Sequence, residues 1–579
     1  MIKVDNLSFS FPQKELFHNI SFTLEDGQHC ALIGTSGSGK STLLDILLDP
    51  ERYMYDGTID IAPDCRIGYV SQFSQLEKTK EITVFEYIAE DFIKLQDELA
   101  SIYIEMETST DMEALLERYQ ITLDSYTAIG GDDFEQNIKR KLNLANLSKH
   151  EKLLVSKLSG GEFKIIQVIK EMLNNPDLMI MDEPDVFLDF ENLNSLRDLI
   201  NTHKGTMLVI THNRYLLNHC FNKILHLENK ELQEFDGRYI DYNFSLLQRK
   251  IELQELSIAD TEEIERNEKL INQLRFKSTI HTEASRGKAL KARIKINERL
   301  EARRIKAPFV DIKQPEIRLN TDHEIEETTI LTVSDYSVAF EDILLENVSF
   351  ELKSNEKVAL IGSNGTGKTT LLRDIYHNSH SSIEIKENSN VAYLSQLHGE
   401  ILNESNTILD EFLDAGFKTN DDVKSHLFNY GFEEEDLSQR ISSLSGGEKN
   451  ILQLAKVAAT KATLLLLDEP TSHLDTYAQI ALEKAIKEYK GAVLMISHDF
   501  YTIVNCMDYV LILEDKAIRK MSMRKFRKLI YANHFDKDYL ELEQKKMSVE
   551  NKIAVALKDS DITLAKELSE ELEELVELL

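Results

Sequence analysis

Short apolar runs alternate along this chain with longer amphipathic stretches, and the alternation occurs twice. Aliphatic runs at 29–34 (HCALIG), 178–181 (LMIM) and 207–210 (MLVI) have counterparts at 357–362, 464–467 and 492–496. Continuous apolar runs of this length are typical of parallel strands that are buried on both faces. The pattern therefore predicts two α/β domains in tandem.

Polar motifs repeat in the same order as the apolar runs. The segment GTSGSGKST at 34–42 recurs as GSNGTGKTT at 362–370, and the pairs YVSQ and YLSQ, LSGGE and LSGGE, MDEP and LDEP, ITH and ISH follow. From the serines of LSGGE to the histidines of the last pair, the two copies keep a constant offset of 286 residues. Between the glutamine and that serine the first copy has 87 positions and the second 49, so the first copy contains an insertion of 38 residues.

Each Gly-rich turn lies between an apolar strand and a helix that opens with Lys and Ser or Thr, which is the P-loop unit of nucleotide-binding domains. Its backbone N–H groups converge on phosphate oxygens at a helix N-terminus, and the lysine adds a positive charge. The candidate nucleotide ligands are Gly34, Gly37, Ser38, Gly39, Lys40, Ser41, Thr42 and Gln72 in the first copy, and Gly362, Asn364, Gly365, Thr366, Gly367, Lys368, Thr369, Thr370 and Gln396 in the second.

An acidic pair ends a buried strand in each copy. Its first member, Asp182 or Asp468, is predicted to hold Mg²⁺ directly or through water. The candidate metal ligands are Ser41, Gln72 and Asp182 in the first copy, and Thr369, Gln396 and Asp468 in the second. The second member, Glu183 or Glu469, is placed to orient and deprotonate the attacking water.

A histidine follows the next apolar strand of each copy. His212 and His498 are predicted to contact the γ-phosphate of the nucleotide and complete the set of catalytic candidates. An isolated motif of this kind could be a solvated turn. Five motifs that occur twice in the same order are not explained in that way.

With its LSGGE motif, the chain resembles the ATP-binding cassette (ABC) superfamily over roughly 1–240 and 330–520. The resemblance implies that each LSGGE motif caps the γ-phosphate of a nucleotide bound to the opposite domain, so that two ATP molecules are sandwiched between the cassettes. The residues concerned are Ser159, Gly160 and Gly161, and Ser445, Gly446 and Gly447. The resemblance also implies that Phe11 and Phe340 stack on adenine, although a core role is equally consistent with the pattern.

The first copy departs from the second after its acidic pair. It reads DEPDVFLD at 182–189 where the second reads DEPTSHLD, and Phe163 stands where the second has Lys449. The acid and the base are kept, so hydrolysis is expected to remain. The loop at 185–187 is the expected source of any inequality between the two sites.

Composition and charge narrow the class of protein. The 579 residues carry a formal charge of −33, and no apolar run is long enough to span a bilayer, which excludes a membrane channel. Single scattered cysteines at 30, 65, 220 and 506 exclude zinc ribbons and disulfide frameworks, and the N-terminus lacks an export signal. A cytoplasmic location is expected.

The segment between the cassettes is locally basic. Residues 246–306 are predicted to form two long helices around a polar break near 278–287, and residues 275–306 hold eleven basic against three acidic side chains. Such a run is often a solvated helix face, but on a helical hairpin it also suits contacts with phosphates. The candidate RNA contacts are Lys288, Lys291, Arg293 and Lys295.

Two cassettes without a membrane domain, joined by a basic helical linker, resemble the ABC-F family. The resemblance implies a helical arm in the first cassette at about 93–126, and binding at the tRNA exit site of the ribosome with contacts to ribosomal RNA and P-site tRNA. The expected domains are the first cassette (1–243), linker (244–310), connector (311–330), second cassette (331–534) and helical C-terminal extension (535–579). The extension has no assigned role.

Three functions are consistent with the sequence. The leading hypothesis is a monomeric, ribosome-bound ATPase whose linker protects the peptidyl-transferase centre against antibiotics. A general translation factor that rescues stalled ribosomes is the second. The third is the ATPase subunit of a membrane transporter, which would leave the basic hairpin unexplained. A DNA-maintenance ATPase agrees even less with the sequence, because long coiled coils and zinc modules are missing.

Overall fold

The computed structural model describes residues 2–11, 14–63, 65–72, 79–107, 111–186, 188–256, 295, 315–321, 328–339, 343–534 and 539–579. They divide into two compact units, which are described separately. The first unit holds both cassettes, as Met1–Asp236 with Lys313–Ile530, and the second combines Gly237–Ile312 with Tyr531–Leu579.

Each cassette contains a six-stranded sheet in which the first five strands are parallel and the last is an antiparallel edge. In the first cassette the order is β5 (Ile67–Val70), β6 (Leu178–Asp182), β7 (Thr206–Ile210), β3 (His29–Ile33), β8 (Lys223–Glu228) and β9 (Glu231–Asp236). In the second it is β14 (Val391–Leu394), β15 (Leu464–Asp468), β16 (Ala492–Ile496), β12 (Lys357–Gly362), β17 (Tyr509–Glu514) and β18 (Ala517–Ser522). The identical orders match the repeat in the sequence.

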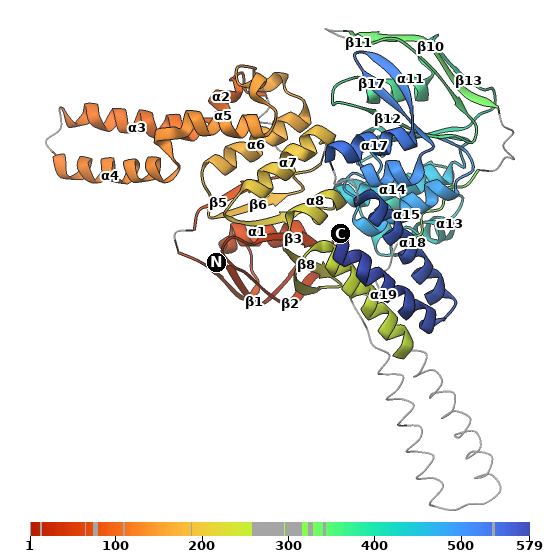
Figure 1. The fold of residues 1–579 in the computed structure, drawn as a ribbon, viewed down its shortest axis with the longest axis horizontal. Coiled ribbons are helices and arrows are strands. Elements are labelled where there is room, and N and C mark those ends of the chain that lie inside the picture. The colour runs from red at the N-terminus through yellow and green to blue at the C-terminus, as the bar shows by residue number, and fades with distance from the viewer. Residues whose placement is uncertain are drawn as a thin grey trace, which may run out of the picture. The chain divides into compact units, whose positions relative to one another are not determined.

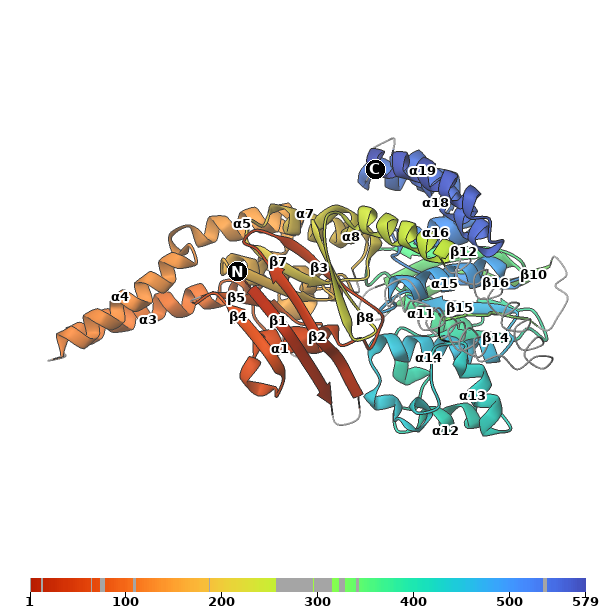
Figure 2. The same ribbon diagram turned by 90° about the horizontal axis from the view of Figure 1, so that it is seen from below.

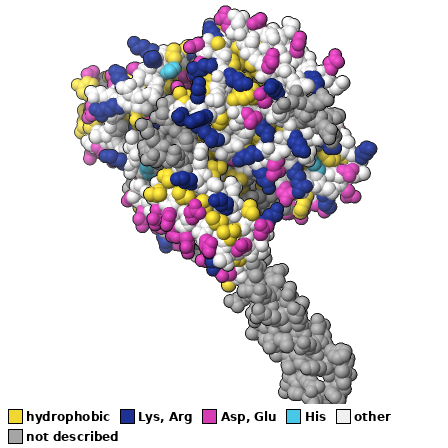
Figure 3. Space-filling view, turned by 45° about the vertical axis from the view of Figure 1, so that its right-hand side comes forward, with side chains coloured by type: hydrophobic (Ala, Val, Ile, Leu, Met, Phe, Trp, Pro, Cys, Tyr) yellow, Lys and Arg dark blue, Asp and Glu magenta, His cyan; other side chains and the backbone are white. Residues whose placement is uncertain are grey.

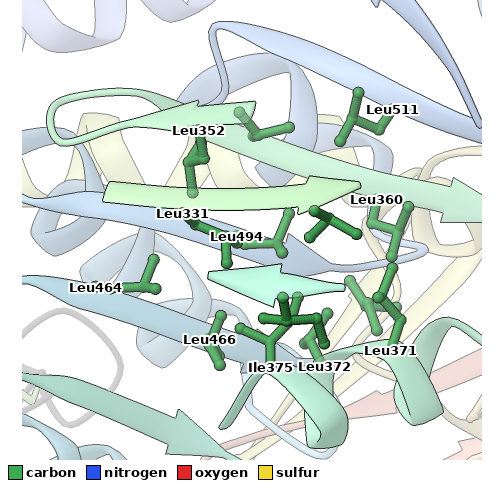
Figure 4. Close-up of a cluster of buried hydrophobic side chains, with 14 of the residues drawn as sticks. Leu331, Leu352, Leu360, Leu371, Leu372, Ile375, Leu464, Leu466, Leu494 and Leu511 are labelled. Atoms are coloured by element: carbon green, nitrogen blue, oxygen red, sulfur yellow. The ribbon is translucent and has the colours of Figure 1, made fainter. Parts of the chain in front are cut away.

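A smaller antiparallel sheet accompanies each large one. Its strands are β2 (Lys14–Leu24), β1 (Ile2–Phe11) and β4 (Asp56–Ile61) in the first cassette, and β11 (Ile343–Lys353), β10 (Thr329–Ala339) and β13 (Ile383–Ile385) in the second. Figure 4 shows how α11 (Lys368–His377) contributes Leu371, Leu372 and Ile375 to the core that also receives Leu331 from β10 and Leu494 from β16. Each buried leucine side chain contributes about 2 kcal/mol of hydrophobic stabilisation, so this core fixes the helix that begins at the P-loop.

Helices pack around the large sheets and connect their strands. In the first cassette they are α1 (Lys40–Leu48), α2 (Val84–Ile88), α5 (Phe134–Leu144), α6 (Gly160–Leu173), α7 (Phe190–Thr202) and α8 (Arg214–Cys220). In the second they are α11, α12 (Ile408–Asp414), α13 (Asn420–Phe428), α14 (Gly446–Ala459), α15 (Thr476–Glu488), α16 (Phe500–Cys506) and α17 (Met523–His534). The repeat therefore produces two tandem α/β cassettes, as the sequence predicts.

Two further helices form the arm of the first cassette. Helices α3 (Glu90–Met106) and α4 (Met112–Ala128) lie side by side and project from this cassette in both ribbon views (Figures 1 and 2). Arg118 on α4 pairs with Glu98 and Glu105 on α3. These helices occupy the region for which the sequence predicts an arm at about 93–126.

The second unit is a cluster of helices from two segments that the sequence assigns to separate domains, the linker and the C-terminal extension. A helix over 239–256 packs against α18 (Tyr539–Lys558) and α19 (Ile562–Leu578), with Ile251, Ile553 and Leu572 in their shared apolar core. Lys566 pairs with Glu255 at 2.7 Å. The start of the linker and the C-terminal extension thus form one structure, and the units divide at 236/237 and 530/531, against expected boundaries of 243 and 534.

Candidate nucleotide-binding sites

The P-loops have the backbone geometry that a phosphate cradle requires. Helices α1 and α11 follow Gly39 and Gly367, whose φ values of 100° and 92° lie in the left-handed region, and no side chain caps either helix. At Gly34 a Cβ atom would lie 2.1 Å from the Leu227 carbonyl oxygen, so no larger residue fits there. Uncapped N–H groups at a helix N-terminus are suited to bind anions.

The lysine of each P-loop folds over its own loop. Lys40 Nζ donates to the carbonyl oxygens of Gly34 and Thr35, both at 2.9 Å, and Lys368 Nζ donates to those of Gly362 at 2.7 Å and Ser363 at 2.9 Å. Both ammonium groups are buried, which lowers their pKa, while nearby carboxylates oppose this effect. Each loop therefore holds a positive charge within the phosphate cradle.

The two aspartates at the strand ends fit the role of metal ligand. Burial raises the pKa of Asp182 to about 6, and the Glu183 carboxylate adds to this; burial likewise raises the pKa of Asp468 to about 6. Hydrogen bonds with Ser41 and Thr369 oppose these shifts. In each aspartate, Oδ1 is buried and accepts no hydrogen bond from the described residues. A buried, unpaired carboxylate oxygen beside a hydroxyl is a suitable partial donor set for Mg²⁺, whose shell nucleotide phosphates and water complete.

Within the described ranges, no group of three or more His, Cys, Asp or Glu side chains could hold a metal ion by itself.

Both candidate bases have strained backbones, but their surroundings differ. The φ values of Glu183 and Glu469 are 46° and 49°, in the region that residues other than glycine rarely adopt outside functional sites. Burial would raise the pKa of Glu183, but a hydrogen bond with His473 and nearby positive groups outweigh it and lower this pKa to about 2. Burial, with the charge of Asp468, raises the pKa of Glu469. The two carboxylates are therefore in unequal environments.

The histidines that follow β7 and β16 are neutral at physiological pH. Burial and the charge of the P-loop lysine lower the pKa of His212 and of His498 to about 3. A neutral imidazole beside the phosphate cradle can donate one ring N–H to a γ-phosphate oxygen without adding a proton to it.

The LSGGE motifs fold locally as capping boxes. Ser159 accepts a hydrogen bond from the Glu162 N–H at 3.2 Å, and the Glu162 carboxylate accepts from the Ser159 N–H at 2.7 Å. Ser445 and Glu448 form the same pair. This arrangement starts helices α6 and α14 at the glycines and leaves the glycine N–H groups at the helix ends.

One cavity is lined by both the first LSGGE motif and the second P-loop. It has a volume of about 410 Å³ and is lined by Ser159, Gly160 and Gly161 from the first cassette. The residues that line it from the second cassette include Asn364, Gly365, Gly367, Lys368, Thr369, Thr370, Gln396, Asp468, Glu469 and His498. Among the described residues, no atom outside its own helix turn lies within 4 Å of a Cβ placed on Gly160. We call this composite cavity site 2, and the corresponding combination of the first P-loop with the second LSGGE motif site 1.

Site 1 is closed tightly around its P-loop. A Cβ on Gly447 would lie 2.3 Å from Ser36 Oγ in the first P-loop. Gln72 donates to Glu183 at 2.6 Å, and His473 of the second cassette contacts the same carboxylate at 2.8 Å. Both sites are therefore built from residues of both cassettes.

Two aspartates join the cassettes at positions that sequence reasoning did not select. Asp475 accepts from the Ser36 N–H at 3.2 Å, and Asp189 accepts from the Asn364 N–H at 3.2 Å. With its other oxygen each aspartate caps its own helix, α15 or α7. The signal was present in the sequence, because both aspartates end the repeated eight-residue segments that begin with the acidic pair.

An ion cluster also crosses the interface. The Arg214 guanidinium of α8 pairs with Glu483 on α15 and with Asp499 at 3.0 Å, and it lies over the Tyr501 ring. Arg214 has no basic counterpart in the second cassette, where the repeat places Phe500. Sequence reasoning missed this contact, because a single arginine after the histidine motif has no pattern of its own.

Replacing Arg214 by Met is expected to lower the free energy of unfolding by about 3–5 kcal/mol, because the buried Glu483 and the partly buried Asp499 would lose their cation. Guanidinium unfolding followed by circular dichroism measures this. Arg118→Met removes an exposed cation with partners on the arm and should cost about 0–1 kcal/mol. Equal losses of stability from the two substitutions would contradict the claim that the interface cluster stabilises the protein more than the exposed ion pairs of Arg118 do.

The structure describes the surroundings of some of the remaining residues that the sequence singles out, but not of all of them. Phe11 is half-exposed at the end of β1 and contacts Phe9 edge to face at 5.1 Å. Phe163 is buried against Tyr87. Phe340, Lys288, Lys291 and Arg293 lie outside the described residues, and Lys295 is exposed.

One family model and three relatives show which kind of protein this is. The family model described as ABC transporter matches residues 17–186 and 345–472. The uncharacterized ABC transporter ATP-binding protein YfmM of Bacillus subtilis is 30% identical over 526 residues, covering 86% of this chain and 96% of that protein. The ABC transporter F family member 5 of Arabidopsis thaliana is 28% identical, covering 89% and 75%, and the energy-dependent translational throttle protein EttA of Escherichia coli K12 is 28% identical, covering 87% and 90%.

Solved structures support the fold. The archaeal ribosome recycling factor aABCE1, solved with the ribosomal stalk protein aP1, superposes with a TM-score of 0.55 at 17% identity, covering 91% of this chain and 92% of that chain. In the described ranges, no helix has the length and apolar character needed to cross a membrane. With both cassettes matched by the family model and relatives in the F family aligned along most of the chain, the protein belongs to the ABC-F family of ATP-binding cassette ATPases.

Proposed function

We propose that this ATPase binds the ribosome in an ATP-closed state at the tRNA exit site and releases it after hydrolysis. The observation that carries the proposal is the composite geometry of both sites, in which an LSGGE motif faces the P-loop of the other cassette. ATP bound in such a site contacts both cassettes and therefore favours their closure. The relatives that support a ribosomal role are EttA, named a translational throttle, and a ribosome-bound model of archaeal ABCE1.

The proposed reaction is ATP hydrolysis at two sites with Mg²⁺. Ser41 with Asp182, and Thr369 with Asp468, would hold the cation, which supplies charge neutralisation at the phosphates. Glu183 and Glu469 accept a proton from the attacking water, and Lys40 and Lys368 bind phosphate oxygens. Closure of the two cassettes excludes bulk water from the phosphates.

The proposed partners are ribosomal RNA and P-site tRNA. The chain carries a charge of −33, and Asp and Glu side chains crowd together on part of the surface in Figure 3, so RNA is not attracted by the body as a whole. The eleven basic residues at 275–306 supply the required local positive charge. We therefore propose Lys288, Lys291, Arg293 and Lys295 as RNA contacts of a cytoplasmic, monomeric protein.

We propose further that the linker acts near the peptidyl-transferase centre and protects it against antibiotics. A general factor for stalled ribosomes would share the ATPase cycle and the RNA contacts, but would confer no growth advantage under drugs. Drug-dependent growth of a strain with and without the gene separates these two functions.

Replacing Lys288, Lys291, Arg293 and Lys295 together by Glu is expected to remove ribosome binding. Each lost phosphate contact lowers the log–log salt dependence of binding by roughly 0.7–0.9. Co-sedimentation with ribosomes at several salt concentrations, in the hydrolysis-deficient Glu183→Gln, Glu469→Gln protein, measures the effect.

The matched control reverses the same number of charges on the first cassette. Lys139, Arg140, Lys149 and Lys152 are exposed there, and their replacement by Glu should leave most of the ribosome binding intact. Undiminished co-sedimentation of the linker variant would show that these residues do not contact RNA.

A further inference from the structure

His473 occupies a strained position between the two cassettes. It lies in the loop between β15 and α15 and has a φ of 60°, in the left-handed region. Histidine enters this region more readily than β-branched residues do, but at a cost in free energy. Its side chain is 8% exposed. A buried side chain on a strained loop indicates that the surrounding contacts hold it in place.

The contacts of His473 connect the second cassette to the candidate base of the first. Its Nδ1 atom lies 2.8 Å from Glu183 Oε2, and the Gln72 amide donates to the same oxygen at 2.6 Å. Because an ionised carboxylate only accepts hydrogen bonds, Nδ1 carries the proton in this contact. The same ring packs on the LSGGE motif of its own cassette, since a Cβ on Gly446 would lie 3.2 Å from His473 Cγ.

The repeat places no histidine at the equivalent position of the first cassette. The repeat aligns His473 with Phe187, whose phenyl group has no N–H to donate. Among the described residues, no group donates a hydrogen bond to the buried Oε1 of Glu469, which lies 3.6 Å from His498 Nε2. Among the described residues, Glu183 is therefore the candidate base that a side chain of the opposite cassette contacts.

We propose that His473 is a positioning residue that acts from the second cassette on hydrolysis at site 1. The Nδ1–H group holds one oxygen of Glu183, so that the other oxygen is left to accept the proton of the attacking water. Because the His473 ring lies beside Gly446 of the second LSGGE motif, the orientation of Glu183 depends on closure of that motif over site 1. The inference rests on the proposed role of Glu183 as the base of that site.

The test measures hydrolysis at each site separately in the full-length chain. Glu469→Gln silences site 2, so that its remaining steady-state hydrolysis reports on site 1, and Glu183→Gln does the reverse. Into each background we would introduce His473→Phe, which is the residue that the first cassette carries at this point in the repeat. His473→Asn keeps an N–H donor, and Ser472→Ala is the control in the same loop.

In the Glu469→Gln protein, His473→Phe is expected to lower kcat by about 10- to 100-fold, because a displaced catalytic group typically loses this much, with little change in KM for ATP. His473→Asn should recover part of the rate, and Ser472→Ala should retain it. The effect of His473→Phe should be at least ten times larger in this background than in the Glu183→Gln background.

The outcomes distinguish a positioning role of His473 from a purely structural role in its loop. Equal losses in both backgrounds, or a change confined to KM, would show that His473 supports the loop and would overturn the proposal, as would full activity of His473→Phe at site 1. If the Glu469→Gln protein keeps its turnover when Glu183→Gln is added, the assignment of Glu183 as the base fails instead.

Discussion

Replacing Glu183 and Glu469 together by Gln is expected to abolish ATP turnover while ATP binding is retained. Glutamine keeps the shape of the side chain but cannot accept the proton of the attacking water, and general-base catalysis typically contributes 10²–10⁴-fold to the rate. The P-loops and their lysines are untouched by these substitutions. Phosphate release and the binding of a fluorescent ATP analogue measure the two properties separately.

The matched control is Glu191→Gln, which neutralises an exposed glutamate in the first turn of α7. It should leave turnover unchanged. Phosphate release at the rate of the unmodified protein from the double variant would show that neither glutamate is the base.

Gly160→Asp is expected to prevent the closure that ATP drives at site 2. The cavity leaves space for the new side chain, because no atom of the described residues outside this helix turn lies within 4 Å of a Cβ on Gly160. The effect would therefore be electrostatic, since the carboxylate would face the γ-phosphate of a nucleotide held by Lys368. Two like charges about 4 Å apart cost about 4 kcal/mol at the effective dielectric constant near a protein surface, which corresponds to roughly a 10³-fold loss.

Small-angle scattering with and without ATP measures closure, and Gly160→Ala is the control that adds a methyl group without charge. The alanine variant should compact with ATP as the unmodified protein does. Compaction of the aspartate variant to the same extent would contradict the placement of Gly160 against the γ-phosphate.

The local parts of the sites could be predicted from the sequence, because their chemistry depends on a few consecutive residues. The Gly-rich loop and the capping box of the LSGGE motif each dictate a backbone shape, and the structure has both at the starts of α1, α6, α11 and α14. The positions of the acidic residues at the strand ends also follow from a few consecutive residues. Asp182 and Asp468 end buried strands, which places them at the same edge of the sheet as the P-loops.

Contacts between distant segments could not be predicted in the same way. The sequence shows that the loop after Glu183 differs from its counterpart, but spacing does not reveal that His473 reaches Glu183 in the opposite cassette. The hydrogen bonds from P-loop N–H groups to Asp475 and Asp189 depend on how the cassettes face each other. The packing of α19 on 239–256 depends on tertiary structure too, because a leucine pattern predicts a helix face without naming its partner.

Sedimentation of the Glu183→Gln, Glu469→Gln protein through a sucrose gradient, with ribosomes and ATP, tests ribosome binding by the closed state most directly. We expect the protein to move with the ribosomal fractions when ATP is present and to remain near the top of the gradient when it is absent. A protein that stays at the top in both conditions, and copurifies with membranes from cell lysate, would contradict the ribosomal function and favour a transporter subunit.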